Sequence, residues 1–387
     1  MANIESSSAN PDSIAEAAKA RAAIAAARRI VIKIGTNTIA RQKGSSGIDT
    51  EYLHRIAAEI ADLVRDGRQI ILVTSGAVGM GAHELGLARK PKDIKIKQAC
   101  AAIGQPLLMH EYGAAFNFFG LTAAQLLVTR DAWDRRTAYL NLRSTVEALI
   151  ERRVVPVFNE NDSVSTVEIA FGDNDQLSAY VASKIDAELL IILSDVDALY
   201  DADPRSNPEA KAIPYVRELV PEMMASAGGK GTEFSTGGMK TKLLAVNIAG
   251  DAGCRVVIAH GRAPGVITRI LAGETVGTLF DATSSLRNRQ RWIKNASPQG
   301  SIFIDEGALA AIRANASLLP RGVLGVDGHF DRGAIVLVNG VAKVLTSISS
   351  DELAEARGKR TTPVAGRSMN TGSGLVARPE DIVFLDS

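Results

Sequence analysis

The chain has few of the features that mark disulfide-bonded, zinc-binding or membrane-spanning proteins. It contains 2 cysteines among 387 residues. Neither lies in a CxxC pair, which argues against a disulfide framework or a zinc cluster and is typical of a reducing, cytoplasmic compartment. No apolar run reaches the roughly 18 residues that a membrane-spanning helix needs. The formal net charge is +1, so general attraction to nucleic acid or membranes is not expected.

Aromatic residues are also scarce, at 5% of the chain, whereas hydrophobic residues make up 46%. This balance is typical of aliphatic α/β layers, and the length favours one large and one small domain. Residues 1–27 are rich in Ala and Ser but carry acidic residues at their start, unlike a signal peptide. We expect them to form a disordered or frayed leader, partly helical, with no catalytic role.

Apolar, β-branched runs alternate with segments of helical periodicity through most of the chain. Strands are expected at Arg29–Ile34, Gln69–Val73, Val154–Phe158, Ala187–Leu193 and Cys254–Ala259. Helices are expected at Glu51–Asp66, Ile94–His110, Arg136–Arg152, Gln176–Lys184 and Lys240–Gly250. This alternation predicts an α/β fold with a doubly wound, mainly parallel sheet covered by helices on both faces.

The pattern changes after residue 285. Residues 286–299 contain several basic side chains without a strand pattern and are expected to be a linker. Residues 300–378 contain short strands, such as Ile335–Val338 and Ala342–Leu345, between Gly and Asp turns. We therefore expect a large domain over residues 28–285, a small β-rich domain over 300–378, and a C-terminal tail over 379–387.

Six separated loops carry glycines, hydroxyls, lysines and carboxylates, and most of them follow a buried strand. The six segments are Val31–Asn37, Thr74–Gly79, Asn159–Thr166, Phe171–Asp175, Leu193–Tyr200 and Ser235–Lys242. Ligands of open α/β sheets bind outside the carboxyl ends of the strands. These loops are therefore expected to converge on one crevice.

Two lysines are placed where they would meet an anion. Lys33 lies inside an otherwise apolar strand and is followed by Gly35, which would let backbone N–H groups approach a phosphate. Lys242 follows the Gly237-Gly238 pair in the first turn of an expected helix, where backbone donors form an anion site. Taken singly, each would also fit an exposed lysine at an element's end. Neither a GxxxxGK[ST] loop nor a GxGxxG fingerprint is present.

Acidic and amide side chains complete the loops. The acidic candidates are Glu160, Asp162, Asp173, Asp175, Asp195 and Asp197, with Asn159, Asn161 and Asn174 beside them. Singly, each would be a solvated turn residue. Clustered at strand ends, they could hold Mg²⁺, orient the lysines or bind an amino group. The pattern assigns none of these side chains individually to a metal. Ser75 lacks a GxSxG setting and is expected to donate a hydrogen bond.

Taken together, these motifs resemble the amino acid kinase family. The resemblance covers about Arg29–Phe280 and rests on VIKIGTN, TSGAVG, NENDSV, FGDNDQLSA, KQACAAIGQPLLM and YLNLRST. The C-terminal part resembles a PUA domain. Ser235, Ser194 and Ala198 depart from the family pattern, which bears on the fine geometry of nucleotide binding and not on the reaction.

The resemblance implies transfer of the γ-phosphoryl group of ATP, with Mg²⁺, to the γ-carboxylate of L-glutamate, the first step of proline biosynthesis. The catalytic candidates are then Lys33, Lys242, Asp173 and Asp175, with the two aspartates holding the lysines. Nucleotide contacts would come from Lys33, Ser194, Asp195, Thr236, Gly237, Gly238, Met239, Lys240, Thr241 and Lys242. Glutamate contacts would come from Ser75, Asp162 and Asn174, with Asp162 on the α-ammonium group and the other two on carboxylates.

The family also implies feedback inhibition by L-proline and a homo-oligomer, either a dimer or a tetramer. PUA domains often bind RNA, but residues 298–387 contain nine basic and ten acidic residues, and an RNA platform is normally basic. Two alternatives stay open: an RNA-binding regulator on a kinase-like fold, and a related carboxylate kinase that acts on another amino acid.

Overall fold

The computed structural model describes residues 11–40, 47–87, 89, 91–130, 133, 135–165, 173–204, 206–226, 238–282, 290, 293–294, 296–356 and 375–385. The chain divides into two compact units, Met1–Ser285 and Leu286–Ser387. Each unit has its own sheet and its own hydrophobic core.

The first unit is built on an eight-stranded sheet with the order β3-β4-β2-β1-β5-β9-β10-β8. Its strands are β1 (Arg29–Ile34), β2 (Gln69–Val73), β3 (Ala123–Val128), β4 (Val155–Glu160), β5 (Leu189–Ser194), β8 (Tyr215–Val216), β9 (Arg255–His260) and β10 (Thr278–Phe280). All neighbouring strands of this sheet are parallel except β9 and β10. The mainly parallel α/β fold expected from the sequence is confirmed.

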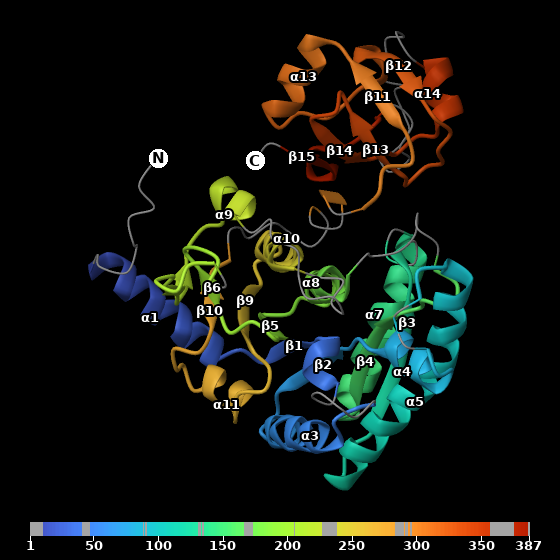
Figure 1. Cartoon of the computed structure of the whole chain (residues 1–387). Helices are drawn as coiled ribbons and strands as arrows, with labels where there is room; N and C mark the ends of the chain where they lie inside the picture. The colour runs from blue at the N-terminus through green and yellow to red at the C-terminus, as the bar shows by residue number, and fades with distance from the viewer. Residues whose placement is uncertain are drawn as a thin grey trace. The chain divides into compact units, whose positions relative to one another are not determined.

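Helices cover both faces of this sheet, with α8 and α10 on one face and α3 and α11 on the other (Figure 1). The helices whose bounds the structure describes in this unit are α1 (Pro11–Ala25), α2 (Thr36–Ile39), α3 (Thr50–Arg65), α4 (Ala77–Glu84), α5 (Ile94–Phe118), α7 (Arg136–Glu151), α8 (Asn174–Lys184), α9 (Pro221–Ser226), α10 (Met239–Gly250) and α11 (Val266–Leu271). A two-stranded ribbon of β6 (Leu199–Tyr200) and β7 (Ala212–Ile213) completes the unit.

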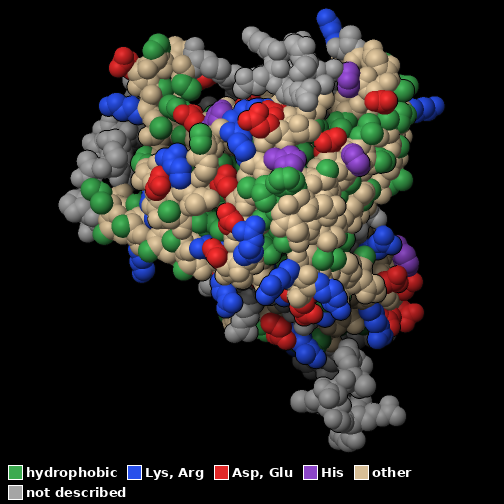
Figure 2. Space-filling model, turned by 90° about the horizontal axis from the view of Figure 1, so that it is seen from below, with side chains coloured by type: hydrophobic (Ala, Val, Ile, Leu, Met, Phe, Trp, Pro, Cys, Tyr) green, Lys and Arg blue, Asp and Glu red, His purple; other side chains and the backbone are tan. Residues whose placement is uncertain are grey.

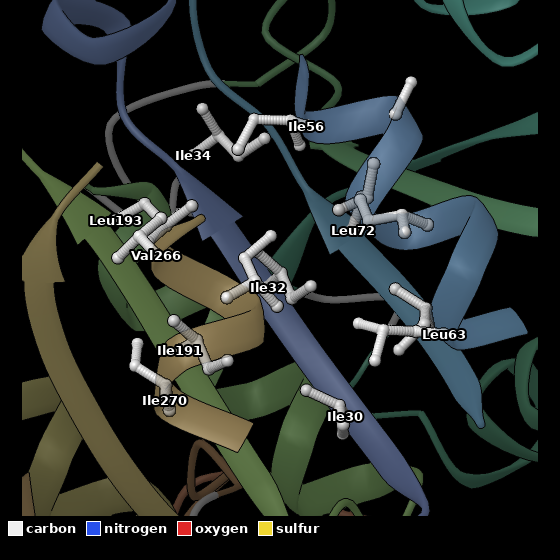
Figure 3. Close-up of a cluster of buried hydrophobic side chains, with 14 of the residues drawn as sticks. Ile30, Ile32, Ile34, Ile56, Leu63, Leu72, Ile191, Leu193, Val266 and Ile270 are labelled. Atoms are coloured by element: carbon white, nitrogen blue, oxygen red, sulfur yellow. The ribbon is translucent and has the colours of Figure 1, made fainter. Parts of the chain in front are cut away.

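Successive side chains of β1 lie on opposite faces of the sheet. Ile30, Ile32 and Ile34 point into the core beneath α3 and α11 (Figure 3). Val31 belongs to the opposite core, against α8 and α10. Because side chains alternate along a strand, Lys33 shares the face of Val31. The one charged side chain of this strand's interior is thereby directed towards α8 and α10.

Helix α5 and strand β3 differ from the sequence-based expectation. Helix α5 continues to Phe118, beyond the expected end at His110 and through Pro106, because Leu108, Tyr112 and Phe116 remain buried against the core. Strand β3 was not expected, since its sequence AAQLLV lacks β-branched residues apart from its last position. Pairing with β4 along six residues makes it a strand.

Residues 11–25 of the expected leader are helical, as was allowed for, but they are not frayed. Helix α1 packs against α11, and Ala20, Ile24 and Ala27 are buried in the core. Arg21 donates hydrogen bonds to the backbone carbonyls of Glu274 and Pro214. The helix is Ala-rich on every side, so its buried stripe is not visible as a periodic pattern. Residues 1–10 lie outside the described part.

The second unit is β-rich, as expected. Its sheet has the order β12-β11-β13-β14-β15. Its elements are β11 (Ser301–Ile304), α13 (Glu306–Arg313), η1 (Pro320–Gly322), β12 (Val323–Asp327), β13 (Ile335–Val338), β14 (Ala342–Leu345), α14 (Ser350–Ala356), η2 (Pro379–Asp381) and β15 (Ile382–Phe384).

One boundary of the second unit needs correction. A tail was expected from residue 379, but β15 pairs with β14 through Ile382, Val383 and Phe384. The apolar triplet closes the edge of the sheet and its first residue joins the core. Of the expected linker, residues 286–289 lie outside the described residues, whereas Ile293 and Ala296 are buried beside the sheet.

Acidic and basic side chains are mixed on the face of the molecule shown in Figure 2. This mixture matches the formal net charge of +1. In the part of the chain that the structure describes, no helix is long and apolar enough to cross a membrane.

Candidate active site

Four of the candidate loops follow strands that are neighbours at the centre of the sheet. Strands β4, β2, β1 and β5 are adjacent and parallel. Their carboxyl ends therefore open on the same edge, where Asn159, Lys33 and Ser194 lie in the last residues of β4, β1 and β5 and Ser75 follows β2. Two helices, α8 and α10, begin near this edge and bring Asp175 and Lys242 to Lys33.

The centre of the site is a buried carboxylate held between two lysines. Oδ1 of Asp175 lies 2.5 Å from Nζ of Lys33, and Oδ2 of the same residue lies 3.1 Å from Nζ of Lys242. The three side chains come from α8, β1 and α10. Their exposed fractions are 0% for Asp175, 5% for Lys33 and 4% for Lys242. Each carboxylate oxygen thus has its own ammonium partner, and neither lysine can turn freely to solvent.

The protonation states of this cluster are set by mutual attraction. Burial alone would raise the pKa of Asp175, but the charges of Lys33 and Lys242 outweigh it and hold the pKa below its ordinary value of 3.8. Burial likewise lowers the pKa of Lys33, yet Asp175, Asp173 and Asp195 together raise it above 10.5. At neutral pH Asp175 is therefore ionised and Lys33 is protonated.

Asp173 has a different position from Asp175, although both were candidates for holding the lysines. Its Oδ1 accepts the backbone N–H of Asp175 and caps the start of α8. Its Oδ2 is buried and has no hydrogen-bond partner among the residues that the structure describes. Asp175 contacts both lysines directly, whereas Asp173 acts on Lys33 only through its charge.

Thr241 extends the cluster towards the start of α10. Its hydroxyl lies 2.9 Å from the carbonyl of Gly238 and 3.3 Å from Oδ2 of Asp175. Gly238 precedes the first turn of the helix, and Lys240 is exposed. Thr236 and Gly237 lie outside the described residues.

A second polar group follows β5. The hydroxyl of Ser194 donates to Oδ1 of Asp195 at 3.0 Å, and Nδ2 of Asn37 donates to Oδ2 at 2.7 Å. Burial raises the pKa of Asp195, but these hydrogen bonds outweigh it, so the pKa lies below 3.8. Asn37 was not singled out from the sequence, although it ends the motif VIKIGTN. Asp197 bonds to the hydroxyl of Tyr200 and does not join this group.

Amide side chains organise the other side of the site, around β2 and β4. Nδ2 of Asn174 lies 2.6 Å from the carbonyl of Thr74, 3.0 Å from the hydroxyl of Ser75 and 2.9 Å from Oδ1 of Asn159. Asn159 in turn donates to Oε1 of Gln105 at 2.8 Å. A carbonyl can only accept, so the hydrogens of Asn174 are engaged within the protein. The polar atom that Asn174 can offer to a ligand is an acceptor, Oδ1.

Asp162 is paired with a lysine that the sequence did not mark as a functional residue. Its Oδ1 lies 3.1 Å from Nζ of Lys97, in the first turn of α5. The neighbouring Gln98 donates to the backbone carbonyl of Ser165 at 3.2 Å, which ties the start of α5 to the turn that carries Asp162. The side chains of Lys97 and Asp162 are 37% and 17% exposed. The only signal for Lys97 was its place at the head of the motif KQACAAIGQPLLM.

Comparison with known proteins identifies the family. The profile of the amino acid kinase family matches residues 28–260. The chain belongs to this family. A PUA domain profile matches residues 300–365, so this chain is an amino acid kinase with a C-terminal PUA domain.

Curated relatives cover almost the whole chain. A protein of Methanosarcina acetivorans named glutamate 5-kinase is 45% identical over 92% of this chain and 96% of its own length. Relatives of the same name from Geobacter sulfurreducens and Moorella thermoacetica are 45% and 44% identical, over 86% and 88% of this chain and 91% and 92% of their own lengths. This amino acid kinase is therefore an enzyme of the phosphotransferase class.

Proposed function

We propose that this amino acid kinase transfers the γ-phosphoryl group of ATP to the side-chain carboxylate of L-glutamate, giving γ-glutamyl phosphate for proline biosynthesis. The name shared by the curated relatives supports the substrate. The observation that carries the chemistry is the buried cluster of Lys33, Asp175 and Lys242. Two fixed positive charges at the carboxyl edge of a parallel sheet suit a reaction between two anions.

The reaction needs charge stabilisation more than it needs a base. The pKa of a glutamate carboxyl group is about 4.3, so it is already a nucleophile at neutral pH. Its approach to a polyphosphate is opposed by repulsion between like charges. Phosphoryl transfer is accelerated mainly by in-line positioning and by charges aimed at the transferring group. We assign that role to Lys33 and Lys242, and we assign Asp175 as the positioning residue that holds them.

The nucleotide is assigned to the side of the site formed by β1, β5 and the start of α10. Asn37, Ser194 and Asp195 form one hydrogen-bonded group there, and the first turn of α10 supplies backbone donors that suit phosphates. Among the described residues there is no group of three or more His, Cys, Asp or Glu side chains that could hold a metal. Mg²⁺ is commonly bound by one or two carboxylates together with substrate phosphates. The buried Oδ2 of Asp173, which has no hydrogen-bond partner within the described ranges, fits this mode, and bound Mg²⁺ would neutralise phosphate charge.

The amino acid is assigned to the side formed by β2, β4 and the start of α5. Asp162 suits the α-ammonium group. Asn174 was expected to serve a carboxylate, but its hydrogens are engaged by Thr74 and Ser75. This supports assigning Oδ1 of Asn174 to the ammonium group as well. Ser75 remains the hydroxyl proposed for a carboxylate. Feedback inhibition by L-proline, a homo-oligomeric state and a cytoplasmic location stay predictions.

The proposal is tested by trapping the product. The purified chain is incubated with ATP, Mg²⁺ and one amino acid at a time, and the acyl phosphate is trapped with hydroxylamine as a coloured hydroxamate. We expect hydroxamate with L-glutamate and little with L-aspartate or N-acetyl-L-glutamate. Strong product with either of these and none with L-glutamate would contradict the proposed substrate.

A further inference from the structure

Lys97 is a charged residue beside the proposed amino-acid site that the proposed function leaves without a role. It lies in the first turn of α5, which begins at Ile94 after the capping residue Asp93. The amino end of a helix carries partial positive charge, so a cation there is disfavoured unless an anion lies close by. Oδ1 of Asp162, at 3.1 Å from Nζ of Lys97, is that anion.

The pair between Lys97 and Asp162 differs from a structural ion pair in its surroundings. Asp162 lies in the turn after β4, and both the backbone of that turn and the start of α5 are held independently of the pair. Gln98 bonds to the carbonyl of Ser165, and the backbone N–H of Asn161 donates to Val128 at 2.9 Å. The pair is therefore not needed to hold the two segments together.

The partial exposure of Lys97 makes the pair exchangeable. At 37% exposure the ammonium group is not locked as those of Lys33 and Lys242 are, and exposed ion pairs contribute little free energy of their own. A ligand that offers each member a new partner of opposite charge can open the pair at small cost. A ligand that offers a partner to Asp162 alone leaves Lys97 facing a second positive charge.

We propose that Lys97 is a specificity residue that recognises the α-carboxylate of the substrate, an inference that rests on the proposed function. Before substrate binds, Lys97 neutralises Asp162. When a zwitterionic α-amino acid arrives, its ammonium group takes Asp162 and its α-carboxylate takes Lys97. Two oppositely charged contacts thus replace one, and the charges stay balanced throughout the exchange.

This exchange selects for the complete α-amino acid head group. 4-Aminobutyrate has the ammonium group and the reacting carboxylate of glutamate but lacks the α-carboxylate. It would displace Lys97 from Asp162 without giving it a partner. Glutarate keeps both carboxylates but lacks the ammonium group, so it would take Lys97 away from Asp162 and leave Asp162 without a partner. The pair therefore disfavours both analogues, because 4-aminobutyrate leaves Lys97 without a partner and glutarate leaves Asp162 without one.

The test compares Lys97→Met with the wild-type chain on L-glutamate and 4-aminobutyrate, using hydroxamate formation as the readout. Methionine keeps the length of the side chain and removes its charge. We expect kcat/KM for L-glutamate to fall by about tenfold to a hundredfold, mainly through KM, as for the loss of one charged contact. We expect kcat/KM for 4-aminobutyrate to stay the same or rise. The matched control is Lys95→Met, an exposed lysine on the same turn, for which both values should match wild type.

The possible outcomes separate the inference from the proposed function. A fall by the same factor for both substrates would show that Lys97 only supports the fold, and the inference would be overturned. Absence of L-glutamate turnover in the wild-type chain would overturn the proposed function and the inference with it. As a second measurement, Asp162→Asn should reduce the preference for L-glutamate over glutarate by at least about tenfold. If Asp162→Asn left the preference for L-glutamate over glutarate unchanged, the exchange mechanism would be contradicted even if Lys97→Met behaved as expected.

Discussion

The two sides of the site both use a lysine–aspartate contact, but they differ in burial. Lys33 and Lys242 share Asp175 in a cluster that is almost completely buried, whereas Lys97 and Asp162 meet where both are partly exposed. Breaking a buried pair leaves an uncompensated charge at high cost, while an exposed pair opens with little loss. Under the proposed function, the same two residue types form a fixed framework for the transferred phosphate in the buried cluster and an exchangeable contact for the amino acid in the exposed pair.

Loss of a framework lysine should have the largest effect. In Lys242→Ala we expect kcat to fall by about a thousandfold, because the positive charge that would stabilise the transferring phosphoryl group is gone. The measurement is ATP-dependent hydroxamate formation at saturating L-glutamate, with circular dichroism to show that the fold is retained. The control is Lys211→Ala, which changes an exposed lysine that directly precedes β7. Near-normal turnover in Lys242→Ala would contradict the proposed role of the buried lysine cluster in catalysis.

The next effect is a change in pH dependence. In the wild-type chain the carboxylate of Asp175 helps to keep the pKa of Lys33 above 10.5 despite burial. In Asp175→Asn, burial acts with less opposition, so the pKa of Lys33 should fall and its positive charge should be lost on raising the pH. We expect the alkaline decline of kcat to move down by more than about one pH unit. An alkaline limb at the wild-type position would contradict this account of Lys33.

A smaller effect is expected where α4 and α5 cross, on the amino-acid side. A Cβ atom at Gly104 would lie 1.9 Å from the carbonyl oxygen of Ala77 and 2.5 Å from the backbone nitrogen of Gly81. Gly104→Ala should therefore push the helices apart and lower the free energy of unfolding by about 1–3 kcal/mol. Because α5 also carries Lys97, KM for L-glutamate should rise by a few fold while kcat changes less.

The matched control for this prediction lies on the same helix. A Cβ atom at Gly113 would have no neighbour within 4 Å. Gly113→Ala should leave turnover unchanged and raise stability slightly through helix propensity, by about 0.5–1 kcal/mol. Thermal unfolding and KM are measured for both variants. Equal behaviour of the two would show that the close helix crossing does not matter.

The smallest effect is expected from an exposed ion pair in the second unit. A hydrogen bond from Arg332 and one from the backbone of Ser349 lower the pKa of Glu352 to about 2 from 4.5. Because the pKa of Glu352 is lower in the folded chain than in the unfolded chain, its ionised form stabilises the fold at pH values above the unfolded pKa. This contribution is lost as the pH falls through about 2. Arg332→Ala should raise this pKa in an NMR titration and leave kcat and KM unchanged. A change in KM for L-glutamate would instead connect the second unit to catalysis.

The sequence predicted the strands that surround the site because these strands are continuous apolar runs. The bounds of β1 and β2 agree with the expected ones. Helix α1 and strand β3 were not anticipated in their observed form, since their sequences are rich in Ala and their state is decided by what they pack against. Propensity is a weak guide where tertiary contacts decide.

The residues of the candidate site could be named from motifs, but their contacts could not. Lys242 lies 67 positions from Asp175, and only the folded sheet shows that Asp175, and not Asp173, touches both lysines. The orientation of Asn174 depends on the carbonyl of Thr74, which carries no sequence signal. Lys97 was missed because a lysine at the start of a helix is ordinarily a solvated residue.

The measurement that tests the central claim most directly is hydroxamate formation by the wild-type chain and by Lys33→Met and Lys242→Met, each with L-glutamate, ATP and Mg²⁺. The account predicts rapid formation of γ-glutamyl hydroxamate by the wild-type chain and a loss of about a thousandfold in kcat for both variants, with their folds retained. Turnover of L-glutamate at a similar rate in all three proteins would contradict it.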